Sequence, residues 1–164
     1  MKLNIGCGEK KLNGYKNIDC RKECNPDICD FIQNIKTFDG ERIEEIYASH
    51  IIEHIPHEDV PIIFERMHSW LKHGDKIFIS VPDLKMISWL ICGGYYDHVL
   101  MNFLYGDSRE GMTHCWGYTE NSLVKEVEKY SFKSLGKFEP FHNDDSGFVY
   151  KGYPLSLNML FERL

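Results

Sequence analysis

The chain has 164 residues, enough to build one domain around a single hydrophobic core, so we expect one domain over residues 1–164. Its formal net charge of −6 argues against a partner held mainly through phosphate groups, which makes nucleic acid an unexpected partner. The longest apolar run, near residues 86–92, is too short for a membrane span, and no signal-peptide pattern leads the chain, so we expect no membrane association, a cytoplasmic location and six reduced cysteines.

The first part of the chain predicts four short strands separated by turns. They are expected at residues 2–5, 16–19, 27–30 and 45–49. A helix is predicted over residues 57–72, where Val60, Ile63, Phe64, Met67 and Leu71 share one face. Lys72 and His73 suit its last turn, and Gly74 supplies a stop.

The second part predicts a buried strand over residues 76–81, a helix over residues 120–130 capped by Thr119, and two antiparallel strands over residues 132–139 and 155–162. Alternating strands and helices indicate an α/β fold with a mainly parallel sheet.

Residues 84–118 show no clear period and are rich in aromatic side chains. A long irregular segment inside a compact domain is usually functional or disordered, and the aromatic content argues against disorder. A packed helical insertion and a lid over an acceptor are the two alternatives for this segment.

A Gly-x-Gly turn, Gly6-Cys7-Gly8, follows the first predicted strand. Glycine lets the backbone N–H groups approach a ligand closely, because no Cβ stands in the way. Asp19 ends the next strand, where a carboxylate is placed to accept hydrogen bonds from both hydroxyls of a ribose. A Gly-x-Gly turn alone is weak evidence, so the order of the later motifs carries more weight.

Five motifs follow one another in the order seen in class I S-adenosylmethionine-dependent methyltransferases. They are Leu3 to Gly8 (LNIGCG), Asn17 to Asp19 (NID), Cys29-Asp30, Tyr47 to His54 (YASHIIEH) and Leu71 to Asp83 (LKHGDKIFISVPD). The chain resembles the small methyltransferases often associated with polysaccharide biosynthesis. The resemblance implies a Rossmann-like, doubly wound, seven-stranded sheet, mostly parallel with an antiparallel C-terminal strand.

The resemblance also implies a site for S-adenosylmethionine. Gly6, Cys7 and Gly8 match the loop around the methionine part, and Asp19 matches the acid that holds the ribose. Asp30 matches the acid near the adenine amino group, with Phe31 as an apolar contact. Ser49 and His50 match the segment beside the sulfonium and the methionine amine.

One departure from the family pattern concerns the first helix. Only ten residues separate Gly8 from Asp19, too few for a full helix and a strand, so we expect the helix to be shortened to a turn or lost. This weakens any contribution of a helix dipole to binding the cofactor carboxylate, and Lys10 or Lys11 is a candidate replacement.

Methyl transfer to a hydroxyl needs a positioned acceptor and a route for its proton. The candidates for catalytic residues are His50, His114 and His54, with Glu53 beside them, because histidine titrates near neutral pH. Packing of His54 against the turn before Pro56 is the alternative for that residue.

Two zinc interpretations compete with this one. His50 to His54 spells H-x-x-E-H, but a zincin needs a continuous helix there, and the flanking strand and Pro56 leave about one turn. Cys20, Cys24 and Cys29 lack the tight C-x₂-C spacing and a fourth ligand. We therefore expect no metal.

The Asn/Asp-Pro-Pro-Tyr/Phe motif of base-modifying methyltransferases is also missing.

The sequence therefore predicts an S-adenosylmethionine-dependent methyltransferase that acts on a small molecule or a saccharide, with transfer to oxygen. The alternative is a non-catalytic S-adenosylmethionine-binding domain that acts as a partner or regulatory protein. Pairing of two copies, as a homo-oligomer, is one way for so short a chain to cover exposed sheet.

Overall fold

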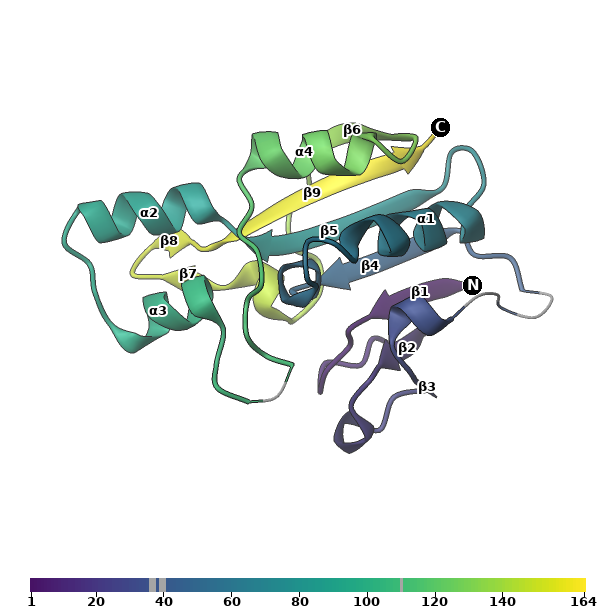
Figure 1. Cartoon of the computed structure of the whole chain (residues 1–164), viewed down its shortest axis with the longest axis horizontal. Helices are drawn as coiled ribbons and strands as arrows, with labels where there is room; N and C mark the ends of the chain where they lie inside the picture. The colour runs from purple at the N-terminus through teal and green to yellow at the C-terminus, as the bar shows by residue number, and fades with distance from the viewer. Residues whose placement is uncertain (36–37, 39–40, 110) are drawn as a thin grey trace.

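The computed structural model describes residues 1–35, 38, 41–109 and 111–164. Its centre is a seven-stranded sheet with the order β3-β2-β1-β4-β5-β9-β6 (Figure 1). The strands are β1 (Lys2–Ile5), β2 (Tyr15–Asp19), β3 (Ile28–Cys29), β4 (Glu45–Ser49), β5 (Lys76–Pro82), β6 (Phe132–Lys137) and β9 (Ser156–Arg163). The first five of these pair in parallel, and β9 is antiparallel to both β5 and β6. The predicted fold class is confirmed.

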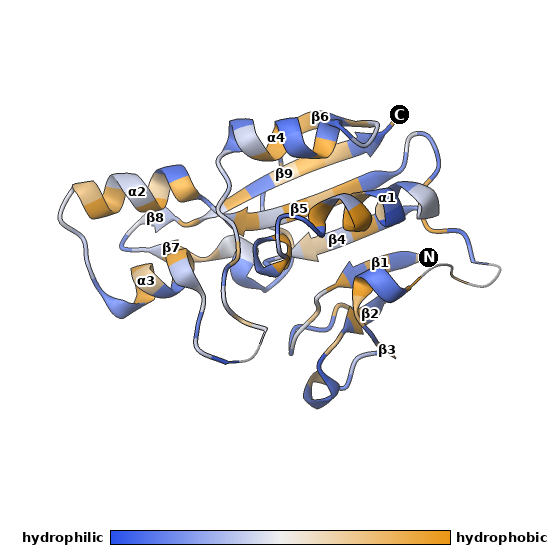
Figure 2. Ribbon diagram, viewed as in Figure 1, coloured by the Kyte–Doolittle hydropathy of each residue, from blue (hydrophilic) through white to orange (hydrophobic). Residues whose placement is uncertain are grey.

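One face of the sheet is covered by two helices, α1 (Val60–Trp70) and α4 (Glu120–Glu128) (Figure 1). Strand residues that point to this face, such as Ile46, Ile77 and Phe161, are fully buried together with Phe64 of α1 and Val127 of α4. Figure 2 shows hydrophobic residues concentrated in β5 and along part of α1. This layer holds the main hydrophobic core.

The opposite face of the sheet is covered by a loop that links β6 to the C-terminal part of the fold. Phe138 and Phe141 pack their rings against Tyr47 of β4 and Phe78 of β5, and His142 packs against Tyr47, at centroid distances of 4.9 to 6.4 Å. The short helix η4 (Asp145–Gly147) is tied to the sheet by hydrogen bonds. Tyr47 Oη donates to Asp144 at 2.8 Å, and Asn158 Nδ2 donates to the carbonyl of Ser146 at 3.0 Å.

The connection from β1 to β2 contains turns but no helix, which confirms the predicted shortening of the first helix. The next connection holds only the 3₁₀ helix η1 (Lys22–Cys24), and η2 (Ile32–Asn34) follows β3. No helix therefore covers the carboxyl ends of β1 and β2, and only the short connecting loops lie there.

The predicted irregular segment 84–118 contains two helices, α2 (Leu84–Cys92) and α3 (His98–Tyr105). The side chain of Asp83 caps α2 by accepting from the N–H groups of Lys85 and Met86, and Asp97 caps α3 in the same way. Both helices pack with the hairpin β7 (Val149–Tyr150) and β8 (Tyr153–Pro154) around a second apolar cluster beyond the ends of β4 and β5 (Figure 1). No helix in the described part of the chain combines the length and the hydropathy of a bilayer-crossing segment.

Several predicted boundaries were wrong by a few residues. Helix α1 begins at Val60 rather than residue 57, because Pro61 has no N–H and fits only the first helical turn. It ends at Trp70, and Leu71 turns to an extended conformation with its side chain in the core. Lys72, His73 and Gly74 therefore lie in the turn before β5.

Candidate active site

The Gly6-Cys7-Gly8 loop closes the carboxyl end of β1. Gly6 and Gly8 have φ angles of +66° and +50°, in the left-handed region that glycine adopts without cost. A Cβ on Gly6 would lie 2.5 Å from Cδ1 of Ile51, so the loop also approaches the segment after β4 too closely for any side chain. Burial, and secondarily Asp19, raises the pKa of the Cys7 thiol to about 11, so this cysteine is a neutral packing group.

Asp19 lies at the end of β2 directly beside the glycine loop. Its carboxylate accepts from the N–H of Gly8 at 2.8 Å, from the N–H of Arg21 at 2.9 Å and from Nε of Arg21 at 3.1 Å. Burial opposes the charged form, but these donors outweigh it and lower the pKa of Asp19. The predicted ribose ligand is therefore ionised, and it is already engaged by Arg21.

Asp30 and Phe31 follow β3 at the edge of the sheet. Asp30 Oδ1 accepts from the N–H of Phe31 at 2.8 Å and from Nδ2 of Asn34 at 2.9 Å. The side chain of Phe31 is 56% exposed. Both residues are accessible, as an adenine contact requires, but neither lines the cavity described below.

His50 and Glu53 form a buried ion pair after β4. His50 has a φ of +52°, a conformation that is uncommon outside glycine. Its Nδ1 lies 3.1 Å from Oε1 of Glu53, and its Nε2 lies 2.9 Å from Oγ of Ser156. Burial alone would lower the pKa of His50, but the Glu53 carboxylate raises it; in turn burial would raise the pKa of Glu53, but His50 lowers it.

The rings of His54 and His114 are in edge-to-face contact on one side of the site, with centroids 4.8 Å apart. His54 belongs to the 3₁₀ helix η3 (Ile52–His54), and His114 lies on the segment after α3. The backbone carbonyl of Glu53 accepts from the N–H groups of Cys115 and Trp116 at 2.7 and 3.2 Å, which fixes that segment against η3. Burial lowers the pKa of His114.

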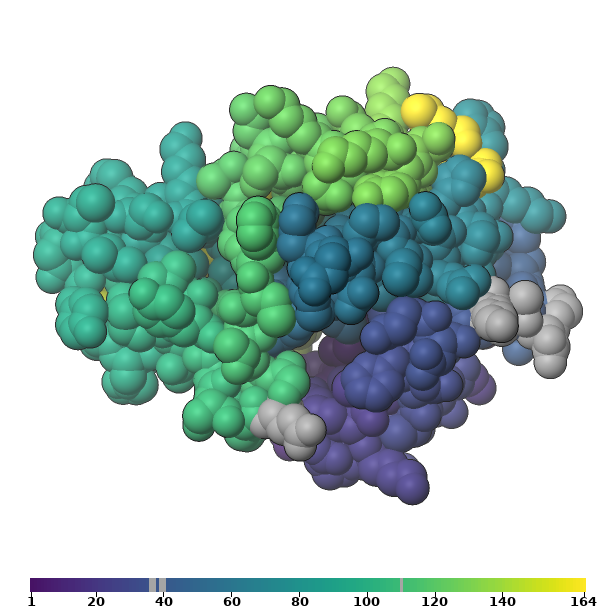
Figure 3. All heavy atoms as spheres, viewed as in Figure 1, coloured from purple at the N-terminus to yellow at the C-terminus, as the bar shows by residue number. Residues whose placement is uncertain are grey.

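These groups surround a cavity of about 400 Å³ at the carboxyl ends of β1 and β4. In the space-filling view the surface is hollowed near the meeting point of the segment after α3, the α1 region and the N-terminal strands (Figure 3). Of the predicted site residues, Gly6, Cys7, Gly8, Ser49, His50, His54 and His114 line it. Asp19 does not line the cavity itself, but its carboxylate accepts hydrogen bonds from Gly8 and Arg21, which do.

Sequence reasoning missed several residues of the cavity wall. Arg21, Asn102, Asp107, Met112, Asp144 and Asp145 all contribute. Arg21 had one available signal, its place two residues after the strand-end acid. Asp144 and Asp145 gave no signal, because only the loop between β6 and β7 brings them to the end of β4. Lys10, one of the two lysines proposed to replace the helix dipole, lines the cavity, and Lys11 does not.

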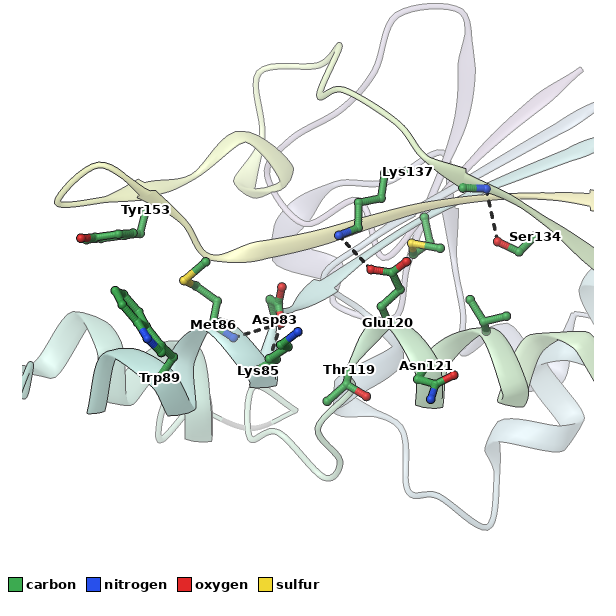
Figure 4. A pocket seen from close by; sticks show the side chains of 13 residues that line it. Asp83, Lys85, Met86, Trp89, Thr119, Glu120, Asn121, Ser134, Lys137 and Tyr153 are labelled. Carbon is green, nitrogen blue, oxygen red and sulfur yellow. Dashed lines mark hydrogen bonds and ion pairs between the residues drawn. The ribbon is translucent and has the colours of Figure 1, made fainter. Parts of the chain in front are cut away.

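A second cavity, of about 1020 Å³, lies between α2, α4 and the β6–β9 edge (Figure 4). Trp89, Tyr153 and the Glu120–Lys137 ion pair border it. Its described lining includes none of the predicted site residues and no glycine turn of the kind that binds a cofactor. Although this second cavity is larger, the glycine loop and the candidate histidines line the smaller cavity.

The geometry of the described residues supports neither of the two zinc interpretations. Residues 50–54 do not form a continuous helix, and His50 is directed to Ser156 rather than alongside His54, so the zincin arrangement does not exist. Among the described residues, no group of three metal-ligating side chains includes Cys20, Cys24 or Cys29.

A parallel sheet that changes winding direction at β1, with a glycine loop and a strand-end acid at that point, defines a nucleotide-type cofactor-binding α/β protein. The "Methyltransferase domain" family model matches residues 5–135, so the chain belongs to that family. No curated protein sequence gave a match.

Solved structures agree on the fold. An S-adenosylmethionine-dependent methyltransferase from Archaeoglobus fulgidus has a TM-score of 0.65 and 17% identity, over 99% of this chain and 85% of that one. One from Clostridium acetobutylicum has a TM-score of 0.64 and 15% identity, over 99% and 83%. The Burkholderia thailandensis 1,6-didemethyltoxoflavin-N1-methyltransferase, solved with 1,6-didemethyltoxoflavin and S-adenosylhomocysteine, has a TM-score of 0.62 and 14% identity, over 99% and 70%. The fold is that of the class I S-adenosylmethionine-dependent methyltransferases.

Proposed function

We propose that this methyltransferase transfers a methyl group from S-adenosylmethionine to a hydroxyl oxygen of a small molecule or saccharide. The observation that carries the proposal is the cavity at the ends of β1 and β4, with the glycine loop on one side and His50, His54 and His114 on the other. Its volume of about 400 Å³ falls within the usual range for small-ligand sites.

The residues present fit the cofactor. Gly6 and Gly8 line the cavity without a Cβ, so a ligand can approach the backbone of the loop closely. In the proposal Asp19 accepts from the ribose hydroxyls in place of the Arg21 side chain, which is partly exposed. Asp30 and Phe31 contact the adenine, and Ser49 and His50 lie beside the sulfonium end.

S-adenosylmethionine, when bound, supplies the methyl group on a sulfonium. The chain's own contribution is to orient the acceptor, to exclude water and to provide a route for the hydroxyl proton. His54 and His114 form the acceptor wall, and the segments 106–109 and 111–114 close over it as a lid. His50 is less available to an acceptor, because both of its ring nitrogens already face protein groups.

Two considerations support the acceptor class. The motifs resemble methyltransferases associated with polysaccharide biosynthesis, and a structural neighbour binds the small molecule 1,6-didemethyltoxoflavin. The net charge of −6 disfavours a polyanionic acceptor.

Calorimetry with S-adenosylhomocysteine tests the cofactor claim. We expect wild type to bind and Asp19→Ala to lose binding. Asp75→Ala is the matched control, because Asp75 is also buried and also paired with an arginine, Arg42. It precedes the amino end of β5, whereas the cavity lies at the carboxyl ends of the strands. No binding by wild type would refute the proposal. Binding without methyl transfer across a panel of hydroxyl acceptors would favour the non-catalytic alternative.

A further inference from the structure

Three potential metal ligands converge at the acceptor end of the cavity. One ligand atom each from Glu53, His54 and His114 lies within 4.8 Å of the other two. A first-row divalent cation holds nitrogen and oxygen ligands at about 2.0 to 2.2 Å, so two ligand atoms on the same side of it are separated by about 3 to 3.6 Å. Small side-chain rotations would therefore bring all three into coordination range.

Glu53 supplies a second observation that favours a cation at this place. Its side chain is 1% exposed. Within the part of the chain that the structure describes, neither carboxylate oxygen accepts a hydrogen bond of normal geometry, and the one ion pair of the carboxylate is between Oε1 and Nδ1 of His50 at 3.1 Å. A buried carboxylate oxygen without a donor is costly, and a cation removes that cost.

The two histidines are held as metal-ligating histidines usually are. Nδ1 of His54 lies 3.1 Å from the carbonyl oxygen of Thr113, which can only accept, so Nδ1 carries a proton and, in the neutral ring, Nε2 is the atom with the lone pair. His114 is fixed through its backbone, because its N–H donates to the carbonyl of Tyr105 at 2.9 Å. Outer hydrogen bonds to backbone carbonyls orient imidazoles and fix their tautomer in metal sites.

We propose that Glu53, His54 and His114 bind one divalent transition-metal cation of the Mn²⁺, Co²⁺ or Zn²⁺ kind, which in turn binds the hydroxyl of the methyl acceptor. Two imidazoles and one carboxylate on one side of a cation leave its remaining positions open for substrate oxygen. This ligand set does not favour Ca²⁺, which takes six to eight oxygen ligands.

The site deepens the proposed function and rests on it for its chemical role. A bound cation lowers the pKa of a coordinated hydroxyl, so the proton leaves to solvent water without a histidine base. The oxygen then forms the new bond to the methyl carbon while the bond from that carbon to sulfur breaks and its electron pair stays on sulfur. His54 and His114 are then ligands, and His50 is a positioning residue for Glu53, in contrast to the sequence-based expectation of a metal-free site.

The test is a titration of the chelator-treated full chain with CoCl₂, followed by visible absorption and by competition with ZnCl₂. We expect one equivalent of Co²⁺ to produce saturable ligand-field bands. His54→Ala and His114→Ala should each weaken binding by at least about tenfold, the lower end of the loss seen even for outer-shell partners. His57→Ala is the matched control, because His57 stacks on Trp116 at 4.2 Å and stays outside the ligand group.

Glu53→Gln keeps the size of the side chain and should also weaken Co²⁺ binding, with circular dichroism as the check on folding. Wild-type affinity in folded His54→Ala and His114→Ala would overturn the proposal, as would no Co²⁺ uptake by wild type. Binding of S-adenosylhomocysteine to cation-free protein is measured separately. Cofactor binding without Co²⁺ uptake refutes the cation site alone, and Co²⁺ uptake without cofactor binding refutes the proposed function alone.

Discussion

Replacing Gly6 by alanine tests whether the glycine loop is required by both its backbone conformation and its close contact with Ile51. The φ of +66° costs a residue with a Cβ about 1 to 2 kcal/mol. The new Cβ would meet Cδ1, Cβ and Cγ1 of Ile51 at 2.5, 2.9 and 3.0 Å. A rotation of the Ile51 side chain cannot move its own Cβ, so the backbone must shift, at an overpacking cost of about 1 to 3 kcal/mol.

The expected loss for Gly6→Ala is therefore about 2 to 5 kcal/mol in the free energy of unfolding. Gly14→Ala is the control, because Gly14 has a φ of +82° but a Cβ added there would meet no described heavy atom within 4 Å. It should lose only about 1 to 2 kcal/mol. Urea unfolding followed by circular dichroism measures both. Equal losses in the two variants would show that contact with Ile51 does not constrain the loop.

Three further predictions concern stability and are measured by the same unfolding assay. Phe161→Ala in β9 removes a fully buried ring and should cost about 3 to 5 kcal/mol, whereas a loss below about 1 kcal/mol would mean that the β9 core is not packed as described. Thr119→Ala removes the cap that accepts from the N–H of Ser122 and should cost about 0.5 to 2 kcal/mol; an unchanged stability would contradict the capping box at α4. Asp75 has a lowered pKa, because Arg42 and the N–H of Lys72 outweigh its burial. The contribution of ionised Asp75 to the free energy of unfolding is complete above its unfolded-state pKa of about 3.9 and fades as the pH falls below that value. The stability difference between wild type and Asp75→Asn should therefore shrink in acid. A difference that stays constant from about pH 7 to about pH 3 would argue against the pairing.

The strands and their order were predictable because each depends on a local pattern. The short runs of the seven-stranded sheet end at a glycine or a polar residue, and Gly6, Asp19 and Ser49 all lie at carboxyl ends of strands as expected, whereas the short hairpin β7–β8 was not predicted. A packed helical insertion was one of the two alternatives for residues 84–118, but the bounds of its two helices were not predicted, although Asp83 and Asp97 are typical capping residues. Their periods are short, and the faces they bury pack against a hairpin far along the chain.

Which residues form the site was easier to predict than how their side chains are arranged. His54 and His114 were both candidates, but Thr113, the neighbour of His114, lies 59 positions after His54, and only the folded segment brings them together. Arg21 illustrates the same limit. Its position near Asp19 was visible, whereas its side chain's engagement of the predicted ribose ligand follows from the turn after β2.

The position of β9 has a consequence for how the protein folds. Strand β6 precedes β9 in the chain but lies outside it in the sheet, and it pairs with β9 alone. Until β9 inserts between β5 and β6, both of those strands expose unpaired edges that can recruit another chain. Its insertion forms pairs across seven residues of β5 and five of β6 at once. We therefore expect this step to limit the folding rate, and partly folded chains that lack it to be the species prone to aggregation.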